Sequence, residues 1–161
     1  MAESTYPTER AESRLFIPAL GGVYAALDAY AHLVLRLAAG LMFVPHGLMK
    51  FGFLGGPGLS GVAGFLGGQG YWPGAFWAPF LATLEVVGGI LLAIGLFTRP
   101  LAALFFIQML FILNFHWGNG FIFNVPGGGV EYPLMWAAVL LYFLVRGGGP
   151  ISVDRAWGRE V

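Results

Sequence analysis

The feature that most constrains this chain is a set of apolar stretches long enough to cross a lipid bilayer. They lie at about residues 29–51, 76–97, 101–117 and 130–145. A bilayer core of ~30 Å requires about 20 helical residues at a rise of 1.5 Å each. The first two stretches reach that length, and the last two, at roughly 16–17 residues, lie at its short end. With 58% hydrophobic and only 10% charged residues, the composition excludes a soluble domain and predicts an all-α membrane protein.

We therefore expect a four-transmembrane-helix bundle over residues 29–146. A polar N-terminal tail and surface segment (1–28) precedes it, and a cytoplasmic C-terminal tail (147–161) follows. Residues 54–74, between the first and second spans, read LGGPGLSGVAGFLGGQGYWPG. This segment is too rich in glycine for an ordinary span and too apolar for a solvated loop. The sequence thus predicts a Gly-rich interfacial or re-entrant segment between helices 1 and 2.

Basic residues indicate the orientation of the spans. With four spans, one side of the membrane holds six arginines and the other side holds only Lys50. The arginines are Arg10, Arg14, Arg99, Arg146, Arg155 and Arg159. Because basic residues gather on the cytoplasmic side, we expect both termini to be cytoplasmic. The formal net charge is zero, so nothing points to a nucleic acid as partner.

Polar side chains within the spans form a candidate intramembrane cluster. An ionisable residue there costs ~2.5–3.5 kcal/mol on insertion scales, so it should face the bundle and find a partner. From the rise per residue, Arg36 lies ~9 Å from Glu85 along the bundle on the cytoplasmic side, and His46 lies ~6 Å from it on the outer side. Both are candidate partners for that carboxylate. Most of the cluster lies in the outer half of the bundle, and its members are Arg36, His46, Lys50, Glu85, Gln108, Asn114, His116 and Glu131.

Each of these residues also has a structural interpretation. An Arg36–Glu85 pair more often specifies a fold than carries chemistry. Glu131 suits the start of a helix, and Lys50 can extend to the membrane surface. Pro45 predicts a helix kink, which fits either a hydrated site or simple helix packing. The residues that we assign to kinking and packing are Gly40, Pro45, Gly47, Gly88 and Gly89.

The residues identify no cofactor. The chain has no cysteine, which excludes disulfides, iron–sulfur ligation and a thiol relay. His32 and His46 have a spacing that stacks two haems in a bundle. Two such haems need four histidine ligands, and the chain has only one further histidine, His116. A single haem between His46 and His116, or a metal ion held by these two and Glu131, is disfavoured. A quinone is compatible with the outer cluster.

Five stretches over roughly residues 31–155 form a recognisable series. These are RLAAGLMFVPHGLMKF, LEVVGGILLAIGLFTRP, QMLFILNFHW, GGGVEYPLMWAAVLL and GGGPISVDR. In these stretches and in their order, the chain resembles the DoxX family of small four-helix bacterial membrane proteins. The resemblance implies a bacterial inner-membrane location. It also places these residues on family motif positions: Arg36, Gly40, His46, Gly47, Lys50, Glu85, Gly88, Gly89, Gly95, His116 and Glu131.

The family is linked to membrane redox systems, including the membrane subunit of thiosulfate:quinone oxidoreductase and companions of terminal oxidases. The resemblance therefore implies an accessory subunit of a larger respiratory or photosynthetic electron-transfer complex. The alternative is a quinone-linked oxidoreductase subunit of the thiosulfate:quinone type, with a polar site in the outer half of the bundle. A small-molecule transporter is the third hypothesis. The expected partners are the lipid bilayer and other membrane subunits or further copies of the chain, and enzymatic activity is left open.

Overall fold

The computed structural model describes residues 15–158, and every regular element in that range is helical. This confirms the all-α prediction for the described residues, and the expected polar tail at residues 1–14 lies outside them. The α-helices are α1 (Gly21–Lys50), α2 (Gly58–Gly68), α3 (Gly74–Thr83), α4 (Gly89–Ile94), α5 (Thr98–His116), α6 (Glu131–Arg146) and α7 (Val153–Trp157). A π-helical turn, η2 (Leu84–Gly88), joins α3 to α4, and short 3-10 turns lie at Pro18–Leu20 and Trp117–Asn119.

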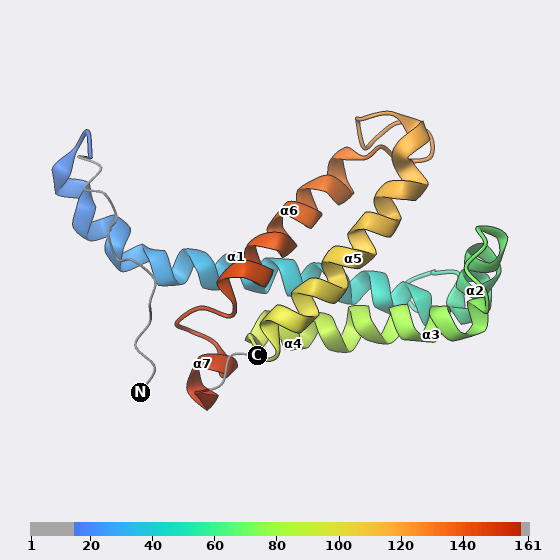
Figure 1. The fold of residues 1–161 in the computed structure, drawn as a ribbon, viewed down its shortest axis with the longest axis horizontal. Helices are drawn as coiled ribbons and strands as arrows, with labels where there is room; N and C mark the ends of the chain where they lie inside the picture. The colour runs from blue at the N-terminus through green and yellow to red at the C-terminus, as the bar shows by residue number, and fades with distance from the viewer. Residues whose placement is uncertain (1–14, 159–161) are drawn as a thin grey trace.

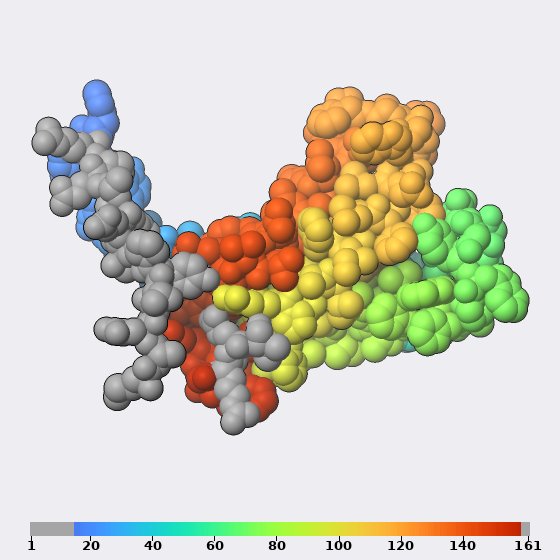
Figure 2. Space-filling view, viewed as in Figure 1, coloured from blue at the N-terminus to red at the C-terminus, as the bar shows by residue number. Residues whose placement is uncertain are grey.

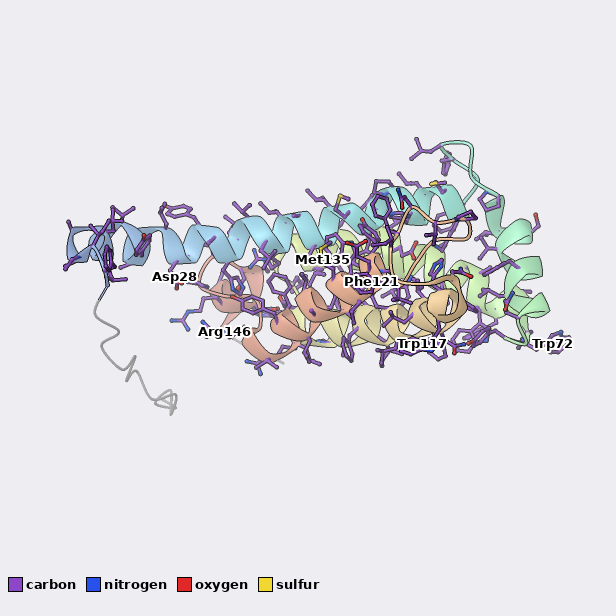
Figure 3. All side chains as sticks on the ribbon, turned by 90° about the horizontal axis from the view of Figure 1, so that it is seen from above. Asp28, Trp72, Trp117, Phe121, Met135 and Arg146 are labelled. Carbon is purple, nitrogen blue, oxygen red and sulfur yellow. The ribbon has the colours of Figure 1, made fainter. Side chains whose placement is uncertain are left out.

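Two pairs of antiparallel helices make up the bundle. The long helix α1 runs beside the continuous segment α3–η2–α4, and α5 and α6 form a hairpin that crosses this first pair obliquely (Figure 1). The short helix α2 runs across the far end of α1 and α3 (Figures 1 and 3). At the opposite end, the first turns of α1 project clear of the other helices (Figure 2).

Within residues 15–158, three helical segments are long and apolar enough to cross a membrane: Pro18–Lys50, Gly74–Ile94 and Thr98–Asn119. They correspond to the first three expected spans. The fourth expected span corresponds to α6, whose 16 residues extend only ~24 Å. The first span also begins earlier than expected, because helix α1 starts at Gly21 and not near residue 29.

Glycines allow α1 to approach the second span closely. A Cβ atom on Gly40 would collide with the backbone of Gly89 and Ala93, and one on Gly47 would lie 2.8 Å from Val86 N. Only glycine fits at such contacts, as is common between membrane helices. The two spans therefore meet backbone to backbone. Helix α1 continues through Pro45 as one helix.

The core lies where the two helix pairs cross. Phe43 of α1 stacks on Phe105 of α5 with ring centroids 4.1 Å apart. The other buried members of this core are Leu84, Leu92, Met109, Ala137 and Leu140. At the sharp turn between α4 and α5, Gly95 adopts a left-handed conformation (φ 75°), which ends α4.

Candidate functional site

Glu85 carries a carboxylate that is buried inside the bundle, with only 2% of the residue exposed. Its Oε2 atom lies 2.6 Å from Lys50 Nζ, and its Oε1 atom accepts a hydrogen bond from Gln108 Nε2. The three side chains come from η2, α1 and α5. A carboxylate in apolar surroundings is costly unless its oxygens have partners. Lys50 and Gln108 supply a partner for each oxygen, so they are what keeps Glu85 inside the bundle.

The local backbone explains why Lys50 reaches Glu85. Gly47 lets α1 approach η2, because its missing side chain leaves room for the backbone of Ala82 and Val86. Lys50 lies one helical turn beyond Gly47 on the same face of α1. The π-helical turn holds one extra residue per turn, and such insertions often occur at functional sites in proteins. Glu85 is thereby directed toward Lys50.

Two cavities meet at these three residues. The first, of about 810 Å³, lies among α1, α2, α3 and α5, and aromatic and aliphatic side chains make up most of its wall. The second, of about 660 Å³, lies among α1, α5, α6 and the loop that joins α5 to α6. Gln108 lines the first cavity, Glu85 lines the second, and Lys50 lines both. The hydrogen-bonded group Lys50–Glu85–Gln108 therefore forms part of the wall between them.

Gln108 has one polar atom that nothing in the described structure satisfies. Its Nε2 atom donates to Glu85, but its Oε1 atom is buried and makes no hydrogen bond. The residue is only 7% exposed and belongs to the wall of the first cavity. Most buried polar atoms in proteins have a partner. This oxygen therefore marks a place where water or a ligand would find a hydrogen-bond acceptor.

The two outer histidines have different surroundings. His46 lines both cavities and is exposed. His116 also lines both, but its Nδ1 atom lies 2.9 and 3.1 Å from the carbonyl oxygens of Gly127 and Gly128, which requires a proton on that nitrogen. Glu131 accepts a hydrogen bond from the backbone of Phe123 (3.2 Å). His116 and Glu131 thus hold the loop that covers the second cavity.

The other two members of the predicted cluster lie elsewhere. Asn114 is exposed and lines neither cavity. Arg36 is 1% exposed and lies at the opposite end of the bundle, where it donates to the carbonyl oxygens of Ala93 (3.2 Å), Ile151 (2.6 Å) and Gly148. Arg36 was a candidate partner of Glu85 in the sequence, but in the structure the two residues are not paired. The partners of Glu85 are Lys50 and Gln108, and those of Arg36 are backbone carbonyls.

The Arg36 region includes Asp154, which the sequence did not single out, and His32, which it considered as a haem ligand. Asp154 is buried, and its carboxylate accepts from the backbone N–H groups of Phe97 (2.8 Å) and Thr98 (2.9 Å) at the start of α5. His32 Nδ1 lies 2.9 Å from the Tyr142 hydroxyl. Segment 147–154 thus folds back onto the end of the bundle, whereas the sequence had suggested a tail. The sequence did carry a signal for a helix here. In the SVDR motif, Ser152 can cap a helix whose first turn holds Asp154.

The described residues, 15–158, contain no group of three or more His, Asp or Glu side chains that could hold a metal ion. What the site offers chemically is an ion pair with a buried carboxylate, an unsatisfied amide oxygen and an aromatic cavity beside them. These features, together with the three apolar helices, define a helical membrane protein with a polar site inside the bundle. Residues 31–117 match the DoxX family, and the chain belongs to that family.

Two relatives extend this comparison. An uncharacterized protein of Haemophilus influenzae is 33% identical over 131 residues, which cover 78% of this chain and 90% of that protein. The Bacillus subtilis protein named "Putative oxidoreductase CatD" is 36% identical over 78 residues, which cover 48% of this chain and 53% of that protein. No solved structure matches the chain.

Proposed function

We propose that this DoxX-family protein is a membrane subunit of a redox system and that its 810 Å³ cavity binds a lipid-soluble quinone. The observation that carries the proposal is the buried Glu85 carboxylate, paired with Lys50 and Gln108 at the wall of an aromatic cavity. Ionisable residues inside a membrane bundle are costly, and by default they mark functional sites. An apolar pocket with a few convergent polar groups is the usual form of a small-molecule site.

The chemistry of the cavity suits such a ligand. Tyr71, Trp77 and Phe111 offer ring surfaces against which a planar quinone ring can stack. Lys50 can donate a hydrogen bond to a quinone oxygen. Glu85 lines the second cavity and not this one, so it would exchange a proton with the ligand through Lys50, which lines both cavities. The name of the Bacillus subtilis relative, "Putative oxidoreductase CatD", agrees with a redox role.

The test is a binding titration with the purified protein in lipid nanodiscs. A short-chain quinone should bind with one site per chain, measured by calorimetry. Leu81→Phe places a larger side chain in the cavity wall and should weaken binding at least tenfold. Ile90→Phe is the matched control, because Ile90 lies on the same span but does not line the cavity. Equal binding by wild type and Leu81→Phe would show that the quinone does not enter this cavity.

The proposed topology has four spans in the bacterial inner membrane, with α6 as a short fourth span and both termini cytoplasmic. The arginine bias supports this orientation. Trp72 and Trp117 lie toward the end of the molecule away from Asp28 and Arg146 (Figure 3), where aromatic residues would meet the outer headgroups. The transverse helix α2 at that end fits an interfacial segment.

An accessory role in a larger complex is the second candidate, and the projecting first turns of α1 favour it. Val23, Leu27 and Tyr30 are 48%, 54% and 58% exposed on one face of these turns. Arg36 lies level with the end of α4, so this face extends about three helical turns beyond the second span. An apolar face of this length fits a partner subunit.

The chain has no cysteine, which permits a direct test in native membranes. Leu27→Cys carrying a photoactivatable maleimide should cross-link to another protein. Ala25→Cys, on the opposite side of the helix, should not. Migration of the gently solubilised protein as a free small species, with no cross-link from position 27, would count against an accessory subunit.

A further inference from the structure

The orientation of the Gln108 amide is set by the ion pair next to it. An ionised carboxylate accepts hydrogen bonds and cannot donate them. Because Glu85 is paired with Lys50 as a carboxylate, the side of the Gln108 amide that faces it must be the NH₂ group. The carbonyl oxygen is left on the other side. That oxygen is the buried atom without a partner, on a residue that lines the first cavity.

Two different hydrogen-bonding groups therefore lie at the cavity wall. Gln108 Oε1, a buried atom of a lining residue, is an acceptor only, and the ammonium group of Lys50 is a donor only. Both groups are bound to the same carboxylate, so they lie near each other. A ligand hydroxyl group satisfies both, because it accepts from Lys50 and donates to Gln108. A carbonyl or ether oxygen accepts from Lys50 but leaves Gln108 Oε1 unsatisfied.

We infer that Gln108 makes this cavity selective for ligands that carry a hydroxyl group on the ring, so that the reduced, hydroxylated form of a lipid-soluble aromatic ligand binds more tightly than the oxidised form. The inference rests on the proposed function, since it concerns the same cavity. Gln108 acts as a specificity-determining residue, and the Lys50–Glu85 pair acts as a positioning group that fixes its amide.

The size of the effect follows from the cost of an unsatisfied buried acceptor. Leaving such a group without a partner weakens binding by about 5- to 100-fold, relative to a ligand that satisfies it. Sites that hydrogen-bond a ligand hydroxyl discriminate strongly against analogues without it, because the polar group of the site is then left unpaired.

Two probes isolate this hydrogen bond from redox chemistry. Para-heptylphenol carries a hydroxyl group, and its methyl ether, para-heptylanisole, has the same ring and chain but no donor. Each is titrated by calorimetry into the full chain in lipid nanodiscs, and the measured quantity is the ratio of the two dissociation constants. Partitioning of the probes into lipid cancels when this ratio is compared between variants. Gln108→Leu and Gln108→Met remove the acceptor, and Gln69→Leu is the control, because that amide is exposed and lies outside the cavity.

The expected result is a phenol preference of about 5- to 100-fold in wild type and Gln69→Leu, which falls close to one in both Gln108 variants. Gln108→Met provides a second, flexible replacement if Gln108→Leu fails to fold. Equal affinity of wild type for the two probes, or a phenol preference that persists without Gln108, would overturn the inference. Quinone binding by wild type in the same experiment would still support the proposed function of the cavity. If neither probe nor the quinone binds wild type, the proposed function fails and this inference fails with it.

Discussion

Replacing Lys50 by methionine should destabilise the protein more than removing the charge of Glu85. The Glu85 side chain is 3% exposed and the Lys50 side chain 23%, so the two partners differ in access to solvent. Lys50→Met leaves a carboxylate inside the bundle with only Gln108 as partner, and losing one member of a buried pair costs about 3–5 kcal/mol. Glu85→Gln leaves Lys50, whose long stem can carry its ammonium to the membrane surface, so we expect about 1 kcal/mol.

The assay is the free energy of unfolding in mixed micelles, measured for both single variants and for the double variant. The double variant, Lys50→Met with Glu85→Gln, should recover most of the loss because no charge remains buried. Arg146→Met is the control, since Arg146 is an exposed cation at the opposite end of the bundle. A Lys50→Met variant as stable as wild type, or a larger loss for Glu85→Gln, would refute the reasoning.

Three further changes test the packing and the inner end of the bundle. Gly40→Val should lower the free energy of unfolding by about 3 kcal/mol or prevent the protein from accumulating, because the new side chain would collide with the α4 backbone. The control Gly64→Val places its side chain in open space and should change the same quantity by less than about 1 kcal/mol. Asp154→Ala removes the acceptor for two N–H groups at the start of α5 and should lower the free energy of unfolding by about 1–2 kcal/mol. Arg36→Gln should leave the carbonyls of segment 147–154 without their donor, and faster amide hydrogen exchange in that segment would be the measured sign.

Much of the fold follows from the sequence, because the apolar stretches determine where helices form. Their length predicted the first three spans. Of the glycines that the sequence assigned to packing, Gly40, Gly47 and Gly89 lie where the first two spans meet at backbone distance, whereas Gly88 lies near Leu101 and Phe105 of α5. The fourth expected stretch, residues 130–145, matches helix α6 (Glu131–Arg146) to within one residue at each end.

The partners of Glu85 could not be predicted from the sequence, for a physical reason. Depth was calculated from 1.5 Å per residue along straight, parallel helices. The π-helical turn at Leu84–Gly88 changes the direction of Glu85, and α5 crosses the first helix pair obliquely, which brings Gln108 to the carboxylate. Both features depend on tertiary packing, and periodicity carries no signal for them. The fold-back of Asp154 depends likewise on contacts with residues far away in sequence.

The most direct test of the central proposal is the identity of the small molecule that leaves the membrane with the protein. Native mass spectrometry of wild type, extracted from membranes without added ligand, should show one quinone per chain, and Leu81→Phe should have lost it. The Ile90→Phe control should retain it. The protein is extracted from membranes that are rich in quinone. If wild type then carries only phospholipid, the cavity is not a quinone site and the proposal is contradicted.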